Sequence, residues 1–217
     1  MRDIFKIAID GPSGAGKSTI AKAVAKRLNI DYIDTGAMYR AIGLKMTRNG
    51  LPMEENDELQ RMLDSTDIDF CSGDVILDGE VVNDQIRTPE MSMAASACSA
   101  LGAVRAKLVQ LQRGMGQKKS VIMDGRDICE VVLPDAEYKY YLTATAEERA
   151  RRRTLELQEK GQDVTFEQVL EDIQQRDYND MNRAITPLRK AEDAVEIDST
   201  SMSIEEVVEF ICRPIEQ

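Results

Sequence analysis

The segment GPSGAGKS at residues 11–18 limits the possible folds of this 217-residue chain more than any other feature. It matches G-x-x-x-x-G-K-[ST], a pattern in which backbone N–H groups of a glycine-rich loop surround phosphate oxygens. An apolar, β-branched run at Ile4–Ile9 precedes the segment, and a helical pattern with Ile20, Val24 and Leu28 follows it. A plain surface turn remains the alternative. The strand, loop and helix order favours a nucleotide-binding loop.

The loop and one later aspartate form a predicted site for ATP and Mg²⁺. Lys17 is expected to bridge the β- and γ-phosphates, and the Ser18 hydroxyl is expected to bind Mg²⁺. Asp124 ends the apolar run Val121–Met123, so it is a second candidate metal ligand, or else a cap of the following turn. The predicted ATP-binding residues are Gly11, Pro12, Ser13, Gly14, Ala15, Gly16, Lys17, Ser18 and Thr19.

Short strand candidates alternate with helical segments along most of the chain. After Ile4–Ile9, the candidates are Tyr32–Asp34, Val121–Met123, Tyr138–Leu142 and Ala194–Ile197. This alternation predicts an α/β fold with a doubly wound parallel sheet. Helix signals fall at three places: Ala146–Lys160 ends before Gly161, and Thr165 with Gln168 and Ser203 with Glu206 have the spacing of capping boxes.

One stretch, Asp67–Val82, does not follow this alternation of strands and helices. It contains three short strand candidates, Ile68–Cys71, Val75–Leu77 and Glu80–Val82, separated by turns at Ser72-Gly73 and Asp78-Gly79. Asp-Gly is typical of the type I′ turns that join antiparallel strands. The sequence therefore predicts a small antiparallel insert, which either binds a substrate or is a surface hairpin without a function.

Composition excludes several classes of protein. A net charge of −11 disfavours nucleic acid and anionic membranes as partners. Histidine is absent, which removes the commonest general base and metal ligand. The four cysteines, Cys71, Cys98, Cys129 and Cys212, form no C-x-x-C pair and are expected to be reduced and mostly packed. The opening MRDIFKIAID has no signal-peptide or membrane-span pattern, so a cytoplasmic location is expected.

Arginines concentrate on two late helices. Arg149, Arg151, Arg152 and Arg153 lie on the first, and Arg176, Asp180 and Arg183 share one face of the second. Such charges are often only solvated. Beside a phosphate-binding loop they favour a lid that closes over transferring phosphates. Because the guanine-reading Asn-Lys-x-Asp is absent and the chain is short and acidic, a metabolite kinase is favoured over a GTPase switch or motor.

Six segments together resemble the bacterial-type cytidylate kinases, and this resemblance covers nearly the whole chain. They are IDGPSGAGKST at 9–19, DTGAMYRA at 34–41, AAS at 94–96 with Arg105 beyond it, DGRD at 124–127, EERARRR at 147–153 and RDYNDMNR at 176–183. The resemblance implies one adenylate-kinase-like P-loop kinase domain over 1–217. Its core would span 1–50 and 100–217, its monophosphate-binding insert about 51–99, and its short helical lid about 147–165.

The resemblance also implies roles for individual residues. Arg40, Arg126 and Arg183 would hold the acceptor phosphate, and Arg176 and Asp180 the sugar hydroxyls. Ser96, Arg105 and Asp127 would read the base. Thr35, also assigned to the substrate, stands where relatives often have serine, and Ser18 where some have glycine. Lys17, Arg126, Arg153 and Arg183 form the predicted catalytic set.

The activity predicted from this resemblance is transfer of the ATP γ-phosphoryl group to CMP or dCMP, with Mg²⁺. The alternatives are a related kinase for UMP, AMP or dTMP, and an ATP-binding regulator without transferase activity. CMP and dCMP are the expected small-molecule partners, with no nucleic acid or membrane partner, and the protein is expected to be a monomer.

Overall fold

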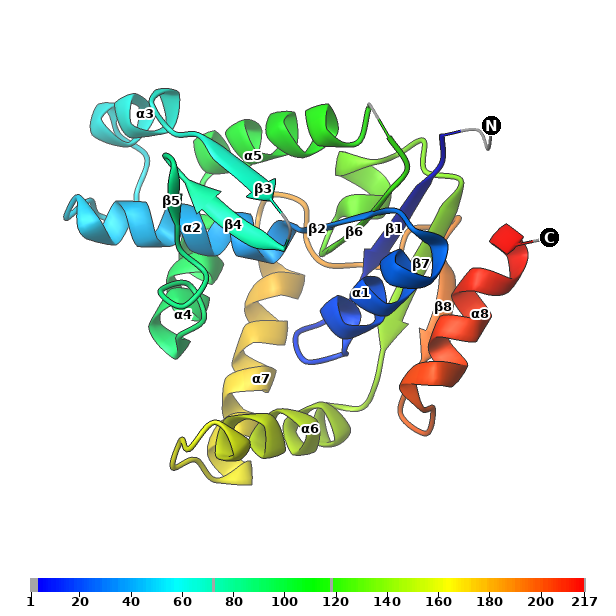
Figure 1. Cartoon of the computed structure of the whole chain (residues 1–217). Helices are drawn as coiled ribbons and strands as arrows, with labels where there is room; N and C mark the ends of the chain where they lie inside the picture. Colours follow the sequence, from blue (N-terminus) through cyan, green and yellow to red (C-terminus); the bar gives the residue numbers. More distant parts are fainter. Residues whose placement is uncertain (1–3, 72, 118, 217) are drawn as a thin grey trace. The chain divides into compact units, whose positions relative to one another are not determined.

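The structure is a computed structural model that describes residues 4–71, 73–117 and 119–216. Five strands form the larger sheet in the order β2-β6-β1-β7-β8 (Figure 1). They are β1 (Lys6–Asp10), β2 (Asp31–Asp34), β6 (Val121–Gly125), β7 (Tyr138–Thr143) and β8 (Val195–Asp198). β1 runs parallel to β6 and β7, and β7 runs parallel to β8. The predicted α/β fold with a parallel sheet is confirmed.

The chain divides into two compact units, 1–32 with 119–217 and 33–118. The helices of the first unit are α1 (Lys17–Leu28), the π-helical turn η1 (Ile128–Val132), α6 (Ala146–Glu159), α7 (Phe166–Asn182) and α8 (Ile204–Glu216). The second unit contains α2 (Thr35–Arg48), α3 (Asp57–Asp64), α4 (Pro89–Cys98), α5 (Gly102–Met115), β3 (Ile68–Cys71), β4 (Asp74–Leu77) and β5 (Glu80–Val81). The predicted boundaries of core, insert and lid stay a prediction.

The core of the first unit lies where α1 covers the sheet. Ile20, Val24 and Leu28 of α1 are all buried, as their spacing predicts, and they join Ile7 and Ile122 of the sheet in one apolar cluster. Helix α8 lies beside α1 and adds Val207 and Ile211 to the same cluster (Figure 1). This packing fixes the start of α1, and therefore the glycine-rich loop, against the carboxyl end of β1.

In the second unit the predicted antiparallel meander is present as the sheet β3-β4-β5. Ile68 pairs with Leu77 between the first two strands. Asp78 and Gly79 have φ values of 50° and 85°, and a type I′ turn requires this left-handed backbone at both central residues. Ser72, in the other predicted turn, lies outside the described residues.

The predicted helix ends are also present. Gly161 follows α6 with a φ of 76°, and the backbone N–H of Thr165 donates to the Gln168 side chain over 3.0 Å to complete a capping box on α7. The backbone N–H of Ser203 donates to Glu206 in the same way at the start of α8. In the part of the chain that is described, no helix is both long and apolar enough to cross a membrane.

Candidate functional site

The glycine-rich loop connects the carboxyl end of β1 to the amino end of α1. Gly11, Gly14 and Gly16 all have positive φ values, 149°, 76° and 88°, which other residues rarely adopt. A Cβ atom at Gly11 would lie 2.0 Å from the carbonyl oxygen of Leu142, so this position has no room for a side chain. The loop therefore wraps closely over β7 and leaves its N–H groups at the helix start, where anions are favoured.

Lys17 is buried at the first position of α1, and its ammonium group turns back over the loop. Its Nζ donates to the carbonyl oxygens of Gly11 and Pro12 over 2.7 and 2.8 Å. Burial, together with the nearby guanidinium of Arg126, lowers the pKa of Lys17 well below its usual range. An anion in the loop would supply the negative charge that the two carbonyl groups lack, and so would favour the charged lysine.

Ser18 and Asp124 meet next to the loop, although they are 106 positions apart in the sequence. The Ser18 hydroxyl donates to Asp124 Oδ2 over 3.0 Å, and the Tyr32 hydroxyl donates to Oδ1 over 2.8 Å. Asp124 is only 4% exposed. The described residues contain no cluster of three or more His, Cys, Asp or Glu side chains that could hold a metal. The hydroxyl and carboxylate pair nevertheless fits Mg²⁺, which takes oxygen ligands and few protein groups beside a nucleotide.

Asp10 connects the start of the loop to the segment that follows β6. Its carboxylate accepts hydrogen bonds from the backbone N–H groups of Ile128 and Cys129, both over 2.8 Å. These two residues begin η1, whose preceding residue, Asp127, makes no side-chain cap. Asp10 therefore caps the turn from another strand and holds the Asp124–Asp127 segment beside the loop.

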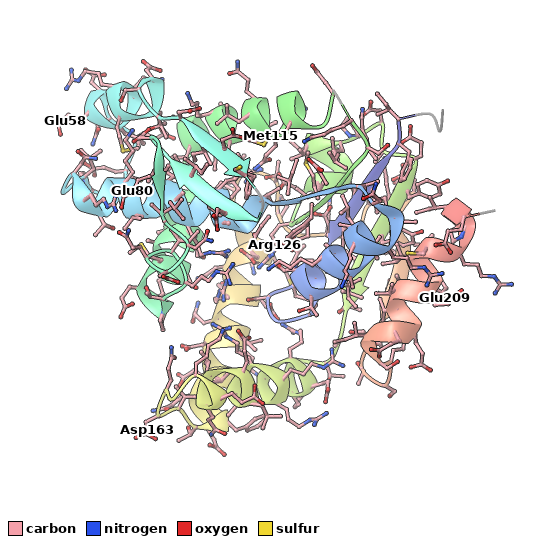
Figure 2. All side chains as sticks on the ribbon, in the orientation of Figure 1. Glu58, Glu80, Met115, Arg126, Asp163 and Glu209 are labelled. Atoms are coloured by element: carbon pink, nitrogen blue, oxygen red, sulfur yellow. The ribbon has the colours of Figure 1, made fainter. Side chains whose placement is uncertain are left out.

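Four predicted acceptor residues lie together in the first unit. Arg126 Nε donates to Asp180 Oδ2 over 2.7 Å, and Arg183 Nη2 lies 4.0 Å from Asp127 Oδ1. Figure 2 shows Arg126 beside the ribbon of α7, which carries Asp180. Burial alone would raise the pKa of Asp180, but the guanidinium of Arg126 outweighs it and lowers that pKa. Arg176, on the same helix, is half-buried.

The arginines of α6 differ in their surroundings. Arg149 is 5% exposed and donates to the carbonyl oxygen of Ser13 in the loop over 2.8 Å. Arg151 and Arg153 form ion pairs with Glu148 and Glu156 of their own helix. Only Arg149 of these three is thus buried in the protein interior. Arg153, the member of the predicted catalytic set that lies on α6, pairs with the exposed Glu156.

The remaining predicted substrate residues belong to the second unit. Thr35 is buried at the start of α2, where Asp34 caps the helix and also accepts from Arg40 Nη2 over 3.2 Å. The Nε atom of Arg40 is buried without a hydrogen-bond partner. Arg105 is buried on α5, and its Nη1 lies 3.4 Å from the Tyr39 hydroxyl.

Ser96 lies on α4, which packs against α2, the helix that carries Arg40. A Cβ atom at Gly43 would lie 2.9 Å from Ala94 Cβ, so the two helices are in close contact there. The glycine at 43 permits this approach.

Sequence reasoning missed the residues that hold the predicted site in place. Tyr32 donates to Asp124, and Asp34 accepts from Arg40. Asp10 accepts from the backbone after Asp127, and Asp177 accepts from Arg149, which contacts the loop. Asp34 has a local signal, because an aspartate three residues before a helical N–H is a common cap. The partners of Asp10 and Tyr32 are about 90 to 120 positions away, so no local pattern could identify them.

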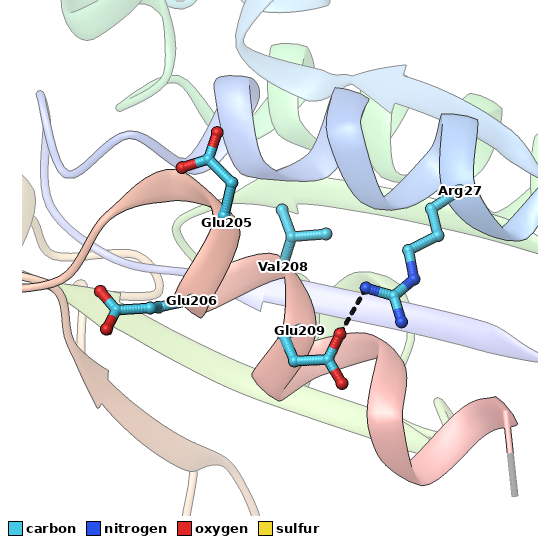
Figure 3. A pocket seen from close by; sticks show the side chains of 5 residues that line it. All are labelled: Arg27, Glu205, Glu206, Val208 and Glu209. Atoms are coloured by element: carbon cyan, nitrogen blue, oxygen red, sulfur yellow. Dashed lines mark hydrogen bonds and ion pairs between the residues drawn. The ribbon is translucent and has the colours of Figure 1, made fainter.

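A surface pocket lies apart from these residues, between α1 and α8. It is lined by Arg27, Glu205, Glu206, Val208 and Glu209 (Figure 3). Arg27 forms an ion pair with Glu209 over 2.6 Å across it. Its carboxylates make it unsuited to phosphate, so it does not belong to the candidate site.

Comparison with known proteins identifies the family. Residues 7–217 match the family described as cytidylate kinase. The chain is 56% identical over 211 residues to the cytidylate kinase of Caldicellulosiruptor saccharolyticus, covering 95% of this chain and 93% of the relative. It is 51% identical over 217 residues to that of Clostridium perfringens strain SM101, covering all of both chains.

Solved structures agree on the fold alone. The shikimate kinase of Bacteroides thetaiotaomicron has a TM-score of 0.52 at 15% identity, covering 99% of this chain and 100% of its own. The loop, its lysine and the hydroxyl–carboxylate pair are therefore set in a P-loop kinase fold. Together with the full-length matches above, this shows that the chain belongs to the cytidylate kinase family.

Proposed function

We propose that this chain transfers the γ-phosphoryl group of ATP to CMP or dCMP, giving CDP or dCDP. Membership of the cytidylate kinase family carries this proposal. The first unit supports it, because it contains a phosphate-binding loop and a separate cluster of arginines, Arg126 and Arg183, with two carboxylates. A kinase needs one group of residues for the donor phosphates and another for the acceptor.

The donor phosphates are expected to lie in the loop at residues 11–19. In that position they would replace the Gly11 and Pro12 carbonyl groups as partners of Lys17, whose charge stabilises the transferring phosphoryl group. Ser18 and Asp124 would hold Mg²⁺ through their hydroxyl and carboxylate oxygens. When bound, the ion supplies positive charge that neutralises the phosphate oxygens.

The acceptor phosphate is expected to contact Arg126, Arg183 and Arg40. A nucleoside monophosphate is already largely ionised at neutral pH, because its second pKa is about 6. The acceptor oxygen therefore needs positioning and charge compensation but no general base, which is consistent with a chain that lacks histidine. Arg153 is expected to reach the phosphates from α6, and Arg176 and Asp180 to hold the sugar.

Recognition of cytosine is expected to depend on Ser96, Arg105 and Asp127. Cytosine offers an amino donor at N4 and acceptors at N3 and O2, whereas uracil has an acceptor at O4 and a donor at N3. A carboxylate accepts from N4, and a guanidinium donates to N3 and O2. Each reversed contact with uracil costs about 1–3 kcal/mol. The two reversed contacts together should make kcat/KM for CMP several hundredfold or more higher than for UMP.

We further propose that the enzyme acts in the cytoplasm as a monomer, with no nucleic acid or membrane partner. Its net charge of −11 supports the absence of nucleic acid and anionic membrane partners, because polyanions would repel it on average.

Replacement of Lys17 by alanine tests the donor side of the proposal. The variant should lose the charge that stabilises the transferring group, and kcat should fall by about 100-fold or more. Lys26→Ala, an exposed position on the same helix, is the control and should keep its activity. Steady-state turnover with ATP and CMP, beside thermal unfolding of each variant, gives the answer. A folded Lys17→Ala enzyme with wild-type turnover would refute this assignment.

A further inference from the structure

The C-terminal half of α7 carries the predicted acceptor residues but has little apolar packing. Its N-terminal half is fixed by Val169 and Ile173, which are buried against α6 in one apolar cluster. After Ile173, only Asp180 of this helix is buried, and Tyr178 is 64% exposed. The hydrophobic effect therefore does not determine where residues 176–182 lie.

Two ion pairs hold this half of the helix instead. Asp180 accepts from Arg126, as described above. One turn earlier, the Asp177 carboxylate accepts two hydrogen bonds from the Arg149 guanidinium, Nη2 to Oδ2 over 2.6 Å and Nη1 to Oδ1 over 3.2 Å. This bidentate contact fixes the relative orientation of the two side chains as well as their distance, because both groups are planar.

Arg149 also reaches two other elements. Its Nη1 donates to the carbonyl oxygen of Ser13 in the phosphate-binding loop, and its Nε donates to the carbonyl oxygen of Ala144 after β7 over 2.9 Å. A Cβ atom at Gly14 would lie 3.3 Å from Arg149 Cβ, so the loop and α6 are already in close contact. One buried side chain therefore joins the ATP-binding loop, the end of β7 and α7.

We infer that Arg149 and Asp177 are a positioning pair for the acceptor substrate. The pair holds α7 against the phosphate-binding loop, so that Arg176 and Asp180, which flank Asp177, and Arg183 at the end of the helix stand at a fixed distance from the ATP phosphates. This inference rests on the proposed function. It assigns to Arg149 a role different from that of the outer arginines on the same helix.

Stability alone does not require an ion pair at this place. Replacing a buried pair by apolar residues of similar size often leaves stability unchanged or increased, whereas removing one partner is strongly destabilising. A pair that serves only stability could therefore be replaced by two apolar side chains without a change in kinetics. A positioning pair could not be replaced in this way, since contacts between apolar side chains do not fix the orientation of α7 as the ion pair does.

The single variant Asp177→Asn separates the acceptor side from the donor side. It keeps the size of the side chain and leaves the contact from Arg149 to Ser13 in place, but it removes the charge that holds α7. The KM for CMP should rise about tenfold or more, because small displacements of positioned groups have large effects. The KM for ATP should change less than about threefold. Thermal unfolding of the variant establishes the temperature at which it stays folded.

The double variant Arg149→Met/Asp177→Leu tests positioning against stability. It should unfold at a higher temperature than Asp177→Asn, because no buried charge is left alone, although the carbonyl oxygens of Ser13 and Ala144 lose a donor. Its KM for CMP should nevertheless remain raised at least about tenfold. Arg27→Met is the control, since Arg27 pairs with Glu209 at a surface that lies apart from the candidate site. It should have wild-type constants.

Native KM values for CMP in a folded Asp177→Asn enzyme, or in the double variant, would overturn the inference. Calorimetric titration with CMP alone gives the same comparison without turnover. The comparison of wild type with variants distinguishes failure of the proposed function from failure of the positioning pair. A wild-type enzyme inactive with ATP and CMP would reject the proposed function, whereas an active wild type with unaffected variants would reject only the positioning pair.

Discussion

At the scale of single residues, Asp10 is a buried acid whose titration should be visible in the stability of the protein. Burial raises the pKa of Asp10 from 3.8 to about 6, although two backbone N–H groups oppose the shift. The folded chain therefore binds this proton more tightly than the unfolded chain. The contribution of the carboxyl to stability is complete below about pH 4 and is lost as the pH rises to about 6.

Asp10→Asn removes this titration, so the difference in unfolding free energy between variant and wild type should depend on pH. Between pH 4 and pH 7 the difference should move in favour of the variant by up to about 3 kcal/mol. Urea unfolding at several pH values measures it. The lost hydrogen bond adds an offset that does not vary with pH. A difference that stays constant across this window would contradict the account of Asp10.

Gly11 gives a second prediction at this scale. A methyl group there would collide with the Leu142 carbonyl at 2.0 Å, and backbone of β7 cannot move aside without breaking the sheet. Gly11→Ala should therefore prevent folding or abolish ATP binding. Gly161→Ala is the control, because its φ of 76° is also positive but nothing lies within 4 Å. Backbone strain alone should then cost about 1–2 kcal/mol. Equal effects of the two substitutions on thermal unfolding would show that the collision is not decisive.

At the scale of elements, helix α6 lies within the predicted lid of about 147–165, and helix α7 begins directly after it. Closure over the phosphates excludes water that would otherwise hydrolyse ATP. Hydrogen exchange between Glu147 and Gly161 should slow when ATP and CMP analogues are added together. The slowing should be greater towards Gly161 than around Arg149, which is already bonded to Ser13. Unchanged exchange over this range would mean that the outer arginines only face solvent.

These same helices show what sequence patterns can predict about an element. The capping box at Thr165 and the stop at Gly161 depend on neighbours within three residues, so both could be predicted and both are present. The difference between Arg149 and Arg153 could not be predicted. It depends on where the loop and α7 lie in space, and both arginines have the same position on a helical wheel to within about 40°.

At the scale of the whole molecule, the parallel sheet follows from the alternation of short apolar runs with helical patterns. The glycine-rich loop, where the ATP phosphates are predicted to bind, lies at the carboxyl edge of this sheet. The contacts that complete the site join distant parts of the chain. Ser18 with Asp124, and Arg126 with Asp180, are examples. Each of these residues could be identified from a motif. Their pairing could not be predicted, because it depends on the fold and no local sequence pattern determines the strand order.

The central claim is that the acceptor is a cytidine monophosphate, and turnover on a panel of acceptors tests it most directly. With ATP and Mg²⁺, the wild-type chain should be compared on CMP, dCMP, UMP, AMP and dTMP. We expect CMP or dCMP to have the highest kcat/KM, above UMP by about several hundredfold because two hydrogen-bond contacts are reversed in uracil. Equal or faster turnover of UMP, AMP or dTMP would contradict the account.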